Sequence, residues 1–301
     1  MDMASQSDFD SAALIVEGGA MRSVFSAGVL DGFLQANFDP FNYYVGVSAG
    51  ASNLATFLAG TPGRSRSLYL ELALRPEFIS YRRFLRGGHL IDLDWLLAQT
   101  FGSGWQDVPP KVARSRPLYV GVTDVARGEA EFIRANAGNL PALIKASTAL
   151  PLFYRGFPEI DGRPKTDGGV ADGIPLRHAI GLGATRIMVI RSRSLAYVKR
   201  DTLMHRYIRW RLRQYSRLAA AMKERVPRYE AAVELLRHPP PGVAVVDVCP
   251  PPGFVLGRFS RDRAALAEGY GMGVASAADA MARWRRLEMA LMPAPRFAHP
   301  H

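Results

Sequence analysis

The sequence has only one cysteine, Cys249, among its 301 residues. An intramolecular disulfide and a cysteine-based zinc site are therefore excluded, which fits a reducing compartment. Long hydrophobic runs are also missing, because Glu17 and Gly18 interrupt the first apolar stretch and residues 1–11 carry acidic rather than basic side chains. This pattern matches neither a secretory signal nor a membrane span, so we expect a soluble protein of the cytoplasm.

Acidic residues are in the minority. The chain has 38 Lys and Arg against 27 Asp and Glu, which gives a net charge of +11. This excess favours a polyanionic partner, either nucleic acid or an anionic lipid surface. The sequence has no helix-turn-helix, RNA-binding or zinc signature, so we expect no nucleic-acid partner.

Short apolar runs alternate with stretches of helical periodicity along the chain. Strands are expected at residues 12–16, 43–47, 118–125, 131–134, 186–190 and 243–248. Helices are expected at residues 24–35, 51–59 and 139–146, from about 175, twice between 202 and 236, and at 261–286. This alternation predicts an α/β fold with a mostly parallel central sheet and helices on both faces.

We expect one domain over residues 1–301, since no internal repeat or clear boundary is visible. Within it, the sequence divides into a core at about 12–195, a helical and basic C-terminal portion at about 199–290, and a loose tail at 293–301.

The motif Gly46-Val47-Ser48-Ala49-Gly50 lies between an expected buried strand and an expected helix. A serine that attacks an ester needs such a tight strand-to-helix turn, because the turn projects its hydroxyl above the sheet. Gly46 and Gly50 leave room for the helix to pass close to the strand. The helix also directs its positive end at the serine. Ser48 is therefore the candidate nucleophile.

A second segment of small residues, Gly18-Gly19-Ala20-Met21-Arg22, follows the first expected strand. Successive small residues ahead of a helix expose backbone N–H groups in a concave array that can hold an anion. The segment lacks the lysine and the spacing of a P-loop and does not match the dinucleotide fingerprint. Next to a nucleophilic serine, it is better interpreted as an oxyanion hole, with Arg22 bracing the loop or adding positive charge.

The base that would activate Ser48 is expected to be Asp167 rather than a histidine. None of the six histidines falls in a recognisable loop between a late strand and a helix. Asp167, followed by Gly168 and Gly169, lies where the chain must turn tightly with a carboxylate facing a cleft. An ordinary Asx turn is the alternative for this segment. A catalytic role requires burial that raises the pKa of Asp167 above its usual value of roughly 4.

In this order, the three segments resemble the patatin-like phospholipase family. The family is marked by a glycine-rich oxyanion loop, a G-x-S-x-G motif and a later D-G-G or D-G-A. The matching segments are residues 17–22, 46–50 and 167–169, and residues 146–151 match a further family segment. The resemblance covers roughly residues 12–190.

This resemblance implies a three-layer α/β sandwich that hydrolyses acyl esters of lipids. Ser48 and Asp167 would form a catalytic dyad with no histidine, metal or cofactor. The backbone N–H groups of Gly18, Gly19 and Ala20 would hold the oxyanion, and Arg22 would take the place of the family's basic residue.

The chain departs from the family pattern at two positions of the oxyanion loop. Ala20 stands where a third glycine is usual, and Ser23 stands where a glycine usually follows the basic residue. If residue 20 requires a positive φ, its methyl group costs about 1 kcal/mol. Such a cost would slow an enzyme rather than abolish its activity.

Two other functions remain open from the sequence. Ser48, Asp167 and His178 follow the chain order of an α/β-hydrolase triad, although His178 falls on an expected helix close to Asp167. The chain could also be a non-catalytic protein that binds a membrane or another polyanion.

The basic part of the C-terminal portion supports a peripheral contact with an anionic membrane. Residues 199–228 carry ten Lys or Arg against two acids, and Trp210 lies among them. Apolar residues recur there at helical spacing: Ile208, Leu212, Tyr215, Ala219 and Met222. A stripe of this kind either docks on a membrane or packs on the sheet, and packing is the commoner outcome.

Overall fold

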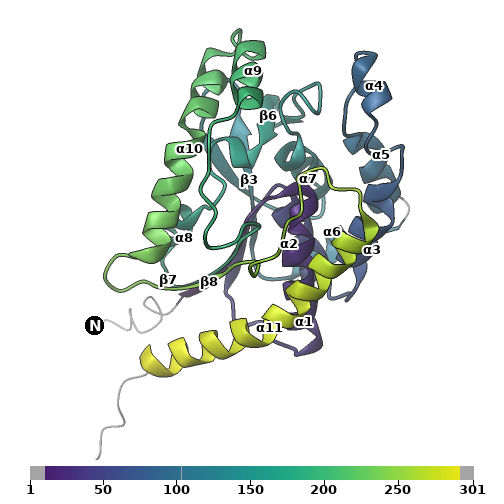
Figure 1. Ribbon diagram of the computed structural model, residues 1–301. Helices are drawn as coiled ribbons and strands as arrows, with labels where there is room; N and C mark the ends of the chain where they lie inside the picture. Colours follow the sequence, from purple (N-terminus) through teal and green to yellow (C-terminus); the bar gives the residue numbers. More distant parts are fainter. Residues whose placement is uncertain (1–10, 103, 292–301) are drawn as a thin grey trace, which may run out of the picture.

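One eight-stranded sheet forms the centre of the molecule (Figure 1). The computed structural model describes residues 11–102 and 104–291. The strands are β1 (Ser11–Val16), β2 (Tyr43–Val47), β3 (Leu118–Asp124), β4 (Ala130–Arg134), β5 (Glu159–Ile160), β6 (Arg163–Asp167), β7 (Ala184–Ile190) and β8 (Ala244–Val248). Their order across the sheet is β5-β6-β3-β2-β1-β7-β8, with β4 paired to β3. The strands from β3 through β2, β1 and β7 to β8 are parallel, whereas β4, β5 and β6 pair in antiparallel fashion.

Helices connect these strands and cover the sheet. The α-helices are α1 (Val24–Gln35), α2 (Ala49–Leu58), α3 (Arg64–Leu70), α4 (Tyr81–Leu85), α5 (Leu93–Leu97), α6 (Val108–Arg114), α7 (Leu140–Thr148), α8 (Leu176–Gly181), α9 (Leu203–Arg211), α10 (Ser216–Arg237) and α11 (Arg263–Leu291). Three short 3₁₀ turns, η1 (Ala20–Ser23), η2 (Leu72–Leu74) and η4 (Gly168–Val170), and one π-helical segment, η3 (Ala98–Gly102), complete the described elements.

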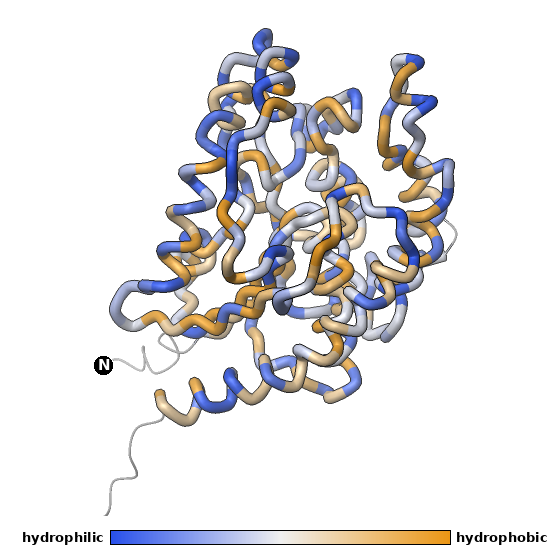
Figure 2. Tube along the Cα trace, viewed as in Figure 1, coloured by the Kyte–Doolittle hydropathy of each residue, from blue (hydrophilic) through white to orange (hydrophobic). Residues whose placement is uncertain are grey.

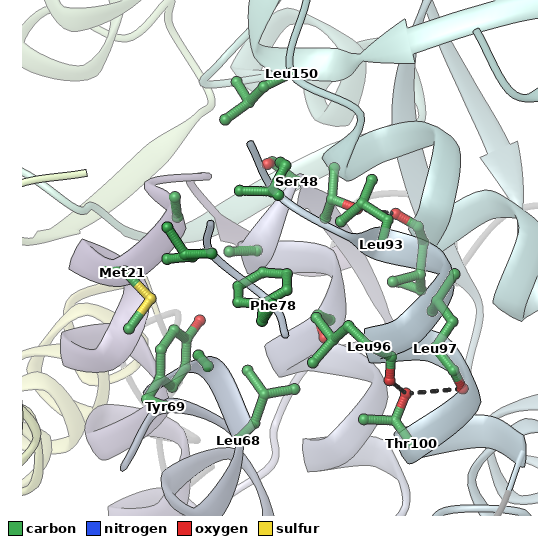
Figure 3. A pocket seen from close by; sticks show the side chains of 18 of the residues that line it. Met21, Ser48, Leu68, Tyr69, Phe78, Leu93, Leu96, Leu97, Thr100 and Leu150 are labelled. Carbon is green, nitrogen blue, oxygen red and sulfur yellow. Dashed lines mark hydrogen bonds between the residues drawn. The ribbon is translucent and has the colours of Figure 1, made fainter. Parts of the chain in front are cut away.

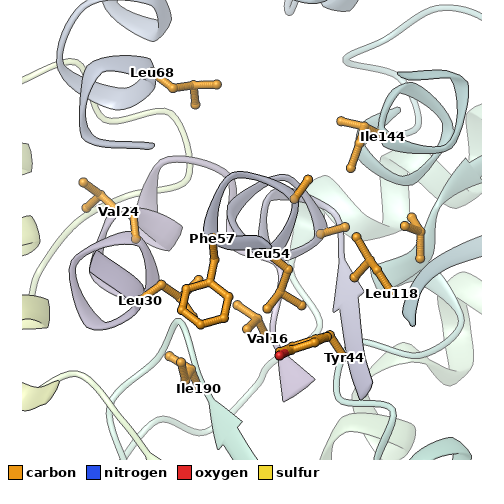
Figure 4. Close-up of a cluster of buried hydrophobic side chains, with 14 of the residues drawn as sticks. Val16, Val24, Leu30, Tyr44, Leu54, Phe57, Leu68, Leu118, Ile144 and Ile190 are labelled. Carbon is orange, nitrogen blue, oxygen red and sulfur yellow. The ribbon is translucent and has the colours of Figure 1, made fainter. Parts of the chain in front are cut away.

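The central strand β1 contributes side chains to both faces of the sheet. Leu14 and Val16 point into a core formed with α1, α2, α7 and α11, part of which is drawn in Figure 4. Ala13 and Ile15 point to the other face, where α8 and the second half of α10 cover them. Because a parallel sheet is buried on both faces, its strands are apolar throughout rather than alternating. The predicted three-layer α/β sandwich is therefore confirmed.

The register of the sheet brings the three sequence motifs together. Val16 of β1 pairs with Gly46 of β2, so the segments that follow these two strands leave the same edge of the sheet side by side. Val122 of β3 pairs with Asp167 at the end of β6, and β3 is also the neighbour of β2. The oxyanion segment, Ser48 and Asp167 consequently meet at the carboxyl edge of the parallel strands, where α/β proteins place their ligands.

All of the expected strands and helices are observed, with shifts at their ends. Helix α2 begins at Ala49 rather than at residue 51, and the last helix runs from Arg263 to Leu291 rather than over 261–286. The hairpin between β3 and β4 is also confirmed. The start of α2 shifts by two residues, which is usual for a helix end, whereas α11 extends five residues beyond its expected end.

Two parts of the fold were missed by the sequence pattern. The helices between residues 62 and 117 are mostly five to seven residues long, too short for a periodic apolar stripe to develop. Strand β6 was missed because it is polar: its Lys165 is fully buried and bonds Asp124 and Glu131 at 2.6 and 2.7 Å.

The C-terminal portion of the chain belongs to the same sandwich. Strand β8 extends the sheet by pairing with β7, and α11 packs along α1. Figure 2 shows many hydrophilic residues along α9 and α10, although both helices also bury apolar side chains such as Ile208 and Leu218 in the core. The expected loose tail at 293–301 lies outside the described residues. In the described parts of the chain, no helix combines the length and hydropathy needed to cross a membrane.

Candidate active site

Ser48 occupies the sharp turn between β2 and α2 that the sequence predicts. Its backbone has a φ of 53° and a ψ of −131°, in the left-handed half of the map that non-glycine residues rarely adopt. A Cβ atom on Gly46 would lie 2.5 Å from Ala51 Cα, and one on Gly50 would lie 2.3 Å from Val16 O. Both glycines are therefore required for α2 to pass so close to the sheet, and this packing holds Ser48 in its strained conformation.

The side chains of Ser48 and Asp167 are directly bonded. Ser48 Oγ donates a hydrogen bond of 2.6 Å to Asp167 Oδ2, and Gly169 N donates one of 2.8 Å to Oδ1. The backbone of Asp167 is fixed as well, since its N–H donates to Ala149 O and its carbonyl accepts from Thr123 Oγ1. The carboxylate is therefore held in a single orientation facing the serine.

Burial sets the electrostatics of this pair. Asp167 is 3% exposed, and burial raises the pKa of its carboxyl above the ordinary value. The hydrogen bond from Ser48 and the positive charges of Arg225 and Arg258 act in the opposite direction without cancelling the effect of burial. A catalytic role for Asp167 requires a raised pKa, and the burial of this carboxyl has that effect.

Ser147 fixes the turn that contains Ser48. Ser48 N–H donates to Ser147 Oγ at 2.8 Å, and Ser147 Oγ donates in turn to Gly121 O at 2.6 Å. Ser147 therefore connects the end of α7, the turn and strand β3 through buried hydrogen bonds. Its sequence segment was matched to the family, but this role depends on strand packing that the sequence does not reveal.

The oxyanion segment runs alongside the nucleophile. A Cβ atom on Gly18 would lie 2.7 Å from Ser48 Cβ, so only glycine fits at this contact. Among the described residues, no hydrogen-bond acceptor contacts the N–H groups of Gly18, Gly19 or Ala20. The N–H groups of Met21 and Arg22 are already bonded, to Arg258 O at 3.2 Å and to Gly19 O at 3.3 Å. Three N–H groups of this segment therefore have no acceptor among the described residues.

Ala20 has the backbone conformation that the sequence analysis identified as costly. Its φ is +50°, a region in which the methyl group of alanine is strained. Ala20 is the first residue of η1, which leads directly into α1. A glycine at position 20 would adopt the same turn without this strain.

The Arg22 side chain is buried and lines a cleft that also contains Ser48. It is 5% exposed, and its Nε is buried without a hydrogen-bond partner among the described residues. Burial and the nearby Arg193 and Arg258 lower the pKa of Arg22 to about 9.

Gly168 and Gly169 form the turn after Asp167, and Gly168 packs against Gly121 of β3.

His178 is not part of this site. Its ring stacks on Phe132 with the centroids 4.1 Å apart, and its Nε2 is buried without a partner among the described residues. The two oxygens of Asp167 accept hydrogen bonds from Ser48 and Gly169 instead. The alternative of a Ser-Asp-His triad is therefore wrong for this chain.

An apolar chamber opens beside Ser48. It encloses about 810 Å³ of space between atoms, part of which is open to solvent, and lies between α2, α3, α5 and the η3 segment. Figure 3 shows Ser48 on one side of the chamber and Leu68, Leu97 and Thr100 on the opposite side. The short helices that the sequence pattern does not predict thus form the wall of the chamber next to Ser48.

The basic segment at 199–228 has both buried and exposed apolar side chains. Ile208, Leu212 and Met222 are buried, whereas Tyr215 is 37% exposed, so most of the apolar stripe packs against the protein rather than facing outward. Trp210 remains exposed on α9. Lys199 and Arg225 line the cleft above Ser48, a placement that the helical spacing did not indicate.

Parts of this chain are similar to known families and proteins. Residues 14–180 match the patatin-like phospholipase family, and residues 215–289 match a domain of unknown function, DUF6363. The uncharacterized protein YjjU of Escherichia coli (strain K12) is 32% identical over 266 residues, which cover 87% of this chain and 74% of that protein. The crystal structure of VipD from Legionella pneumophila overlays with a TM-score of 0.49 at 12% identity, covering 91% of this chain and 67% of that one.

The matched family segment spans β1 through α8 and so contains Ser48, Asp167 and the oxyanion segment. More than half of the chain lies within it. The chain belongs to the patatin-like phospholipase family.

Proposed function

We propose that the protein is a serine acyl hydrolase that cleaves carboxylic ester bonds of lipids. The observation that carries this proposal is the 2.6 Å hydrogen bond from Ser48 Oγ to the buried Asp167 carboxylate, at the mouth of an apolar chamber. A serine hydroxyl becomes a nucleophile when a base lies within hydrogen-bond reach, and the raised pKa of Asp167 suits it to that role.

In the proposed reaction, Asp167 takes the hydroxyl proton of Ser48 as Ser48 Oγ attacks the ester carbonyl. The free N–H groups of Gly18, Gly19 and Ala20 donate hydrogen bonds to the oxyanion that forms. The bond to the alcohol then breaks, the alcohol takes the proton from Asp167, and the acyl group stays on Ser48. Water then attacks this acyl-enzyme while Asp167 takes its proton. The bond between the acyl group and Ser48 Oγ breaks, Ser48 Oγ takes the proton from Asp167, and the fatty acid is released.

The apolar chamber supports a lipid acyl group as the part of the substrate that is recognised. Its lining is dominated by aliphatic and aromatic side chains, among them Leu68, Phe78, Leu93 and Leu96. Each methylene group that leaves water for such surroundings contributes about 0.8 kcal/mol. An acyl chain that enters the chamber would hold its ester carbonyl next to Ser48.

Hydrolysis of p-nitrophenyl esters by purified variants tests this proposal. Ser48→Ala and Asp167→Asn are each expected to lower turnover at least 100-fold, since both remove a partner of the proton transfer. Ser52→Ala is the matched control, because Ser52 lines the same chamber one turn along α2 without bonding Asp167. Turnover by Ser48→Ala at the wild-type rate would contradict the proposal.

We also propose that α9 meets the surface of an anionic membrane. Leu203, Tyr207 and Trp210 are 79%, 48% and 55% exposed on this helix, next to the exposed basic residues Arg206 and Arg211. Apolar side chains flanked by positive charge suit the interface of an anionic bilayer. Co-sedimentation with liposomes tests this contact, and binding that is indifferent to the presence of anionic lipid would refute it.

A further inference from the structure

Arg225 connects the C-terminal portion of the chain to the active site. It lies on α10, within residues 215–289, which match a domain of unknown function, and outside the matched family segment that carries Ser48. Its Nε donates a hydrogen bond of 2.9 Å to Gly169 O, in the turn that follows Asp167. One region of the chain thus carries the carboxylate beside Ser48, and another region contacts the turn that orients it.

Gly169 links Arg225 to the Asp167 carboxylate. Its carbonyl accepts the hydrogen bond from Arg225, and its N–H donates to Asp167 Oδ1 at 2.8 Å. The other carboxylate oxygen, Oδ2, accepts from Ser48 Oγ at 2.6 Å. A continuous series of hydrogen bonds therefore leads from α10 through the turn to the hydroxyl of Ser48.

The turn after Asp167 has no side chain of its own that could fix Gly169. Residues 168 and 169 are both glycines, and a Cβ atom on Gly169 would lie 3.0 Å from Asp167 Oδ1. Glycine leaves the backbone more freedom than other residues do, so the direction of the Gly169 N–H depends on contacts from elsewhere in the fold. The Arg225 guanidinium supplies such a contact at the Gly169 carbonyl.

Arg225 acts on Asp167 without pairing with it. The two carboxylate oxygens accept from Ser48 and Gly169, and among the described residues Arg225 forms no ion pair with a carboxylate. Burial raises the pKa of Asp167, and the charge of Arg225 acts in the opposite direction. A direct ion pair would lower this pKa further and take an oxygen away from Ser48. The contact through Gly169 therefore fixes the turn and leaves Asp167 able to accept a proton.

The same portion of the chain also contacts the oxyanion segment. Met21 N donates to Arg258 O at 3.2 Å, and Arg258 lies in the same matched region as Arg225. Met21 directly follows Ala20, whose N–H has no acceptor among the described residues. Helix α10 and the segment after β8 thus contact the two segments that flank Ser48.

We propose that the C-terminal portion completes the active site, with Arg225 as a positioning residue that holds the turn after Asp167 so that its carboxylate faces Ser48. This inference rests on the proposed function, because it concerns how well Asp167 receives the proton of the serine. Arg225 acts through Gly169 and exchanges no proton itself. Its replacement therefore changes the rate of the reaction and the pKa of Asp167, and leaves the binding of a neutral ester in the apolar chamber intact.

Several charged and titratable groups surround Asp167, and the test has to separate Arg225 from the others. Arg225 and Arg258 are the cations that lower the pKa of Asp167. On the same strand, Lys165 pairs with Asp124 and Glu131. The cleft that contains Asp167 is also lined by Glu17, Arg22, Arg193, Tyr197, Lys199, His205 and Tyr229. All of these groups stay in place when Arg225 alone is replaced, so a change in the pH profile reports on Arg225.

Steady-state hydrolysis of the neutral ester p-nitrophenyl butyrate by full-length variants tests this inference. We expect Arg225→Gln to lower kcat at least tenfold with KM within twofold of wild type, because a misdirected base slows the chemical step and leaves the chamber unchanged. The acid limb of its kcat/KM profile should move to higher pH, since loss of the cation raises the pKa of Asp167. Arg225→Lys keeps the charge without the fork of donors, so its acid limb should stay near that of wild type and its kcat should lie between the other two.

Arg217→Gln is the matched control, because it removes the same charge from an exposed position of α10 that lines neither the cleft nor the chamber. It should keep the wild-type kcat and acid limb. Wild-type kcat with an unmoved acid limb in Arg225→Gln would overturn the inference, and so would a loss confined to KM, which would assign Arg225 to substrate binding. If Arg225→Gln does not fold, wild-type kcat in Arg225→Lys would overturn it.

Titration of the Asp167 carboxyl by carbon-13 NMR needs no turnover and separates this inference from the proposed function. The signal is assigned by its loss in Asp167→Asn. In Arg225→Gln the carboxyl should titrate at a higher pH than in wild type. An unchanged titration would overturn the inference even in a protein that hydrolyses esters, whereas a wild-type protein without hydrolysis would contradict the proposed function and leave this measurement valid.

Discussion

Replacement of Asp167 by asparagine is expected to lower activity and raise stability at the same time. The asparagine amide can still accept the hydrogen bond from Gly169 N, but its NH₂ group would donate to Ser48 Oγ, where the carboxylate now accepts. The serine proton would then have no base to receive it. Loss of a positioned general base costs about 10²- to 10⁴-fold in rate.

The stability change follows from the pKa of Asp167, which burial raises above the ordinary value of 3.8. Between the unfolded and the folded pKa, the folded protein holds a proton that the unfolded chain has lost, so stability falls as pH rises through this window. Above the window, the ionised carboxylate destabilises the fold by about 1.4 kcal/mol for each unit by which its pKa is raised. Asparagine is neutral throughout and avoids this cost.

Urea unfolding of wild-type and Asp167→Asn proteins at pH 7 and at pH 4, with ester turnover measured in parallel, checks both effects. The variant should be the more stable protein at pH 7, and the difference should shrink at the lower pH. Asp172→Asn is the matched control, since burial also raises the pKa of Asp172, to about 6, and its side chain bonds Ile174 N rather than Ser48. This control should gain stability without losing turnover. An Asp167→Asn protein that is less stable at pH 7, or that hydrolyses esters at the wild-type rate, would refute the reasoning.

Three further substitutions test the site. Ala20→Gly relieves about 1–2 kcal/mol of backbone strain in the folded protein and costs about 0.4–1 kcal/mol because the unfolded chain is freer. Urea unfolding should therefore detect a net gain in stability of about 0.5 kcal/mol. Ester turnover should not fall. Ser147→Ala leaves the buried Ser48 N–H without its acceptor, so we expect a loss of about 1–3 kcal/mol in stability and a lower kcat; unchanged values for both would contradict its positioning role. Leu97→Trp should fill the far side of the chamber and lower decanoate turnover at least tenfold relative to butyrate, whereas Leu97→Met should preserve the wild-type ratio.

The turns that carry Ser48 and Asp167 were predictable because each lies in a short segment whose backbone is determined locally. Ser48 needs a glycine on either side of one turn, and Asp167 needs the two glycines that follow it. Apolar strands then fix which segments leave the same edge of the sheet. The sequence pattern was sufficient for the parallel sheet, since each of its central strands is a nearly continuous apolar run.

The residues that surround Ser48 from distant parts of the chain could not be predicted from local sequence patterns. Ser147 bonds both Ser48 N and Gly121 O of β3, and both partners are far from it in sequence, so no local spacing reveals these contacts. The cations of the cleft lie on separate segments, and only the complete fold brings Arg22 next to Arg258. The sequence shows only that an alanine at position 20 would be strained if its φ were positive. The structure shows that its φ is positive.

The central claim is that Ser48 is a nucleophile activated by its surroundings. Treatment of the folded protein with a fluorophosphonate probe, followed by mass spectrometry of the peptide that contains Ser48, tests this claim most directly. A serine paired with a base beside free N–H donors should be labelled at Ser48, more slowly in Asp167→Asn and not at all in Ser48→Ala. A wild-type protein that stays unlabelled at Ser48, as expected of a binding module, would contradict the account.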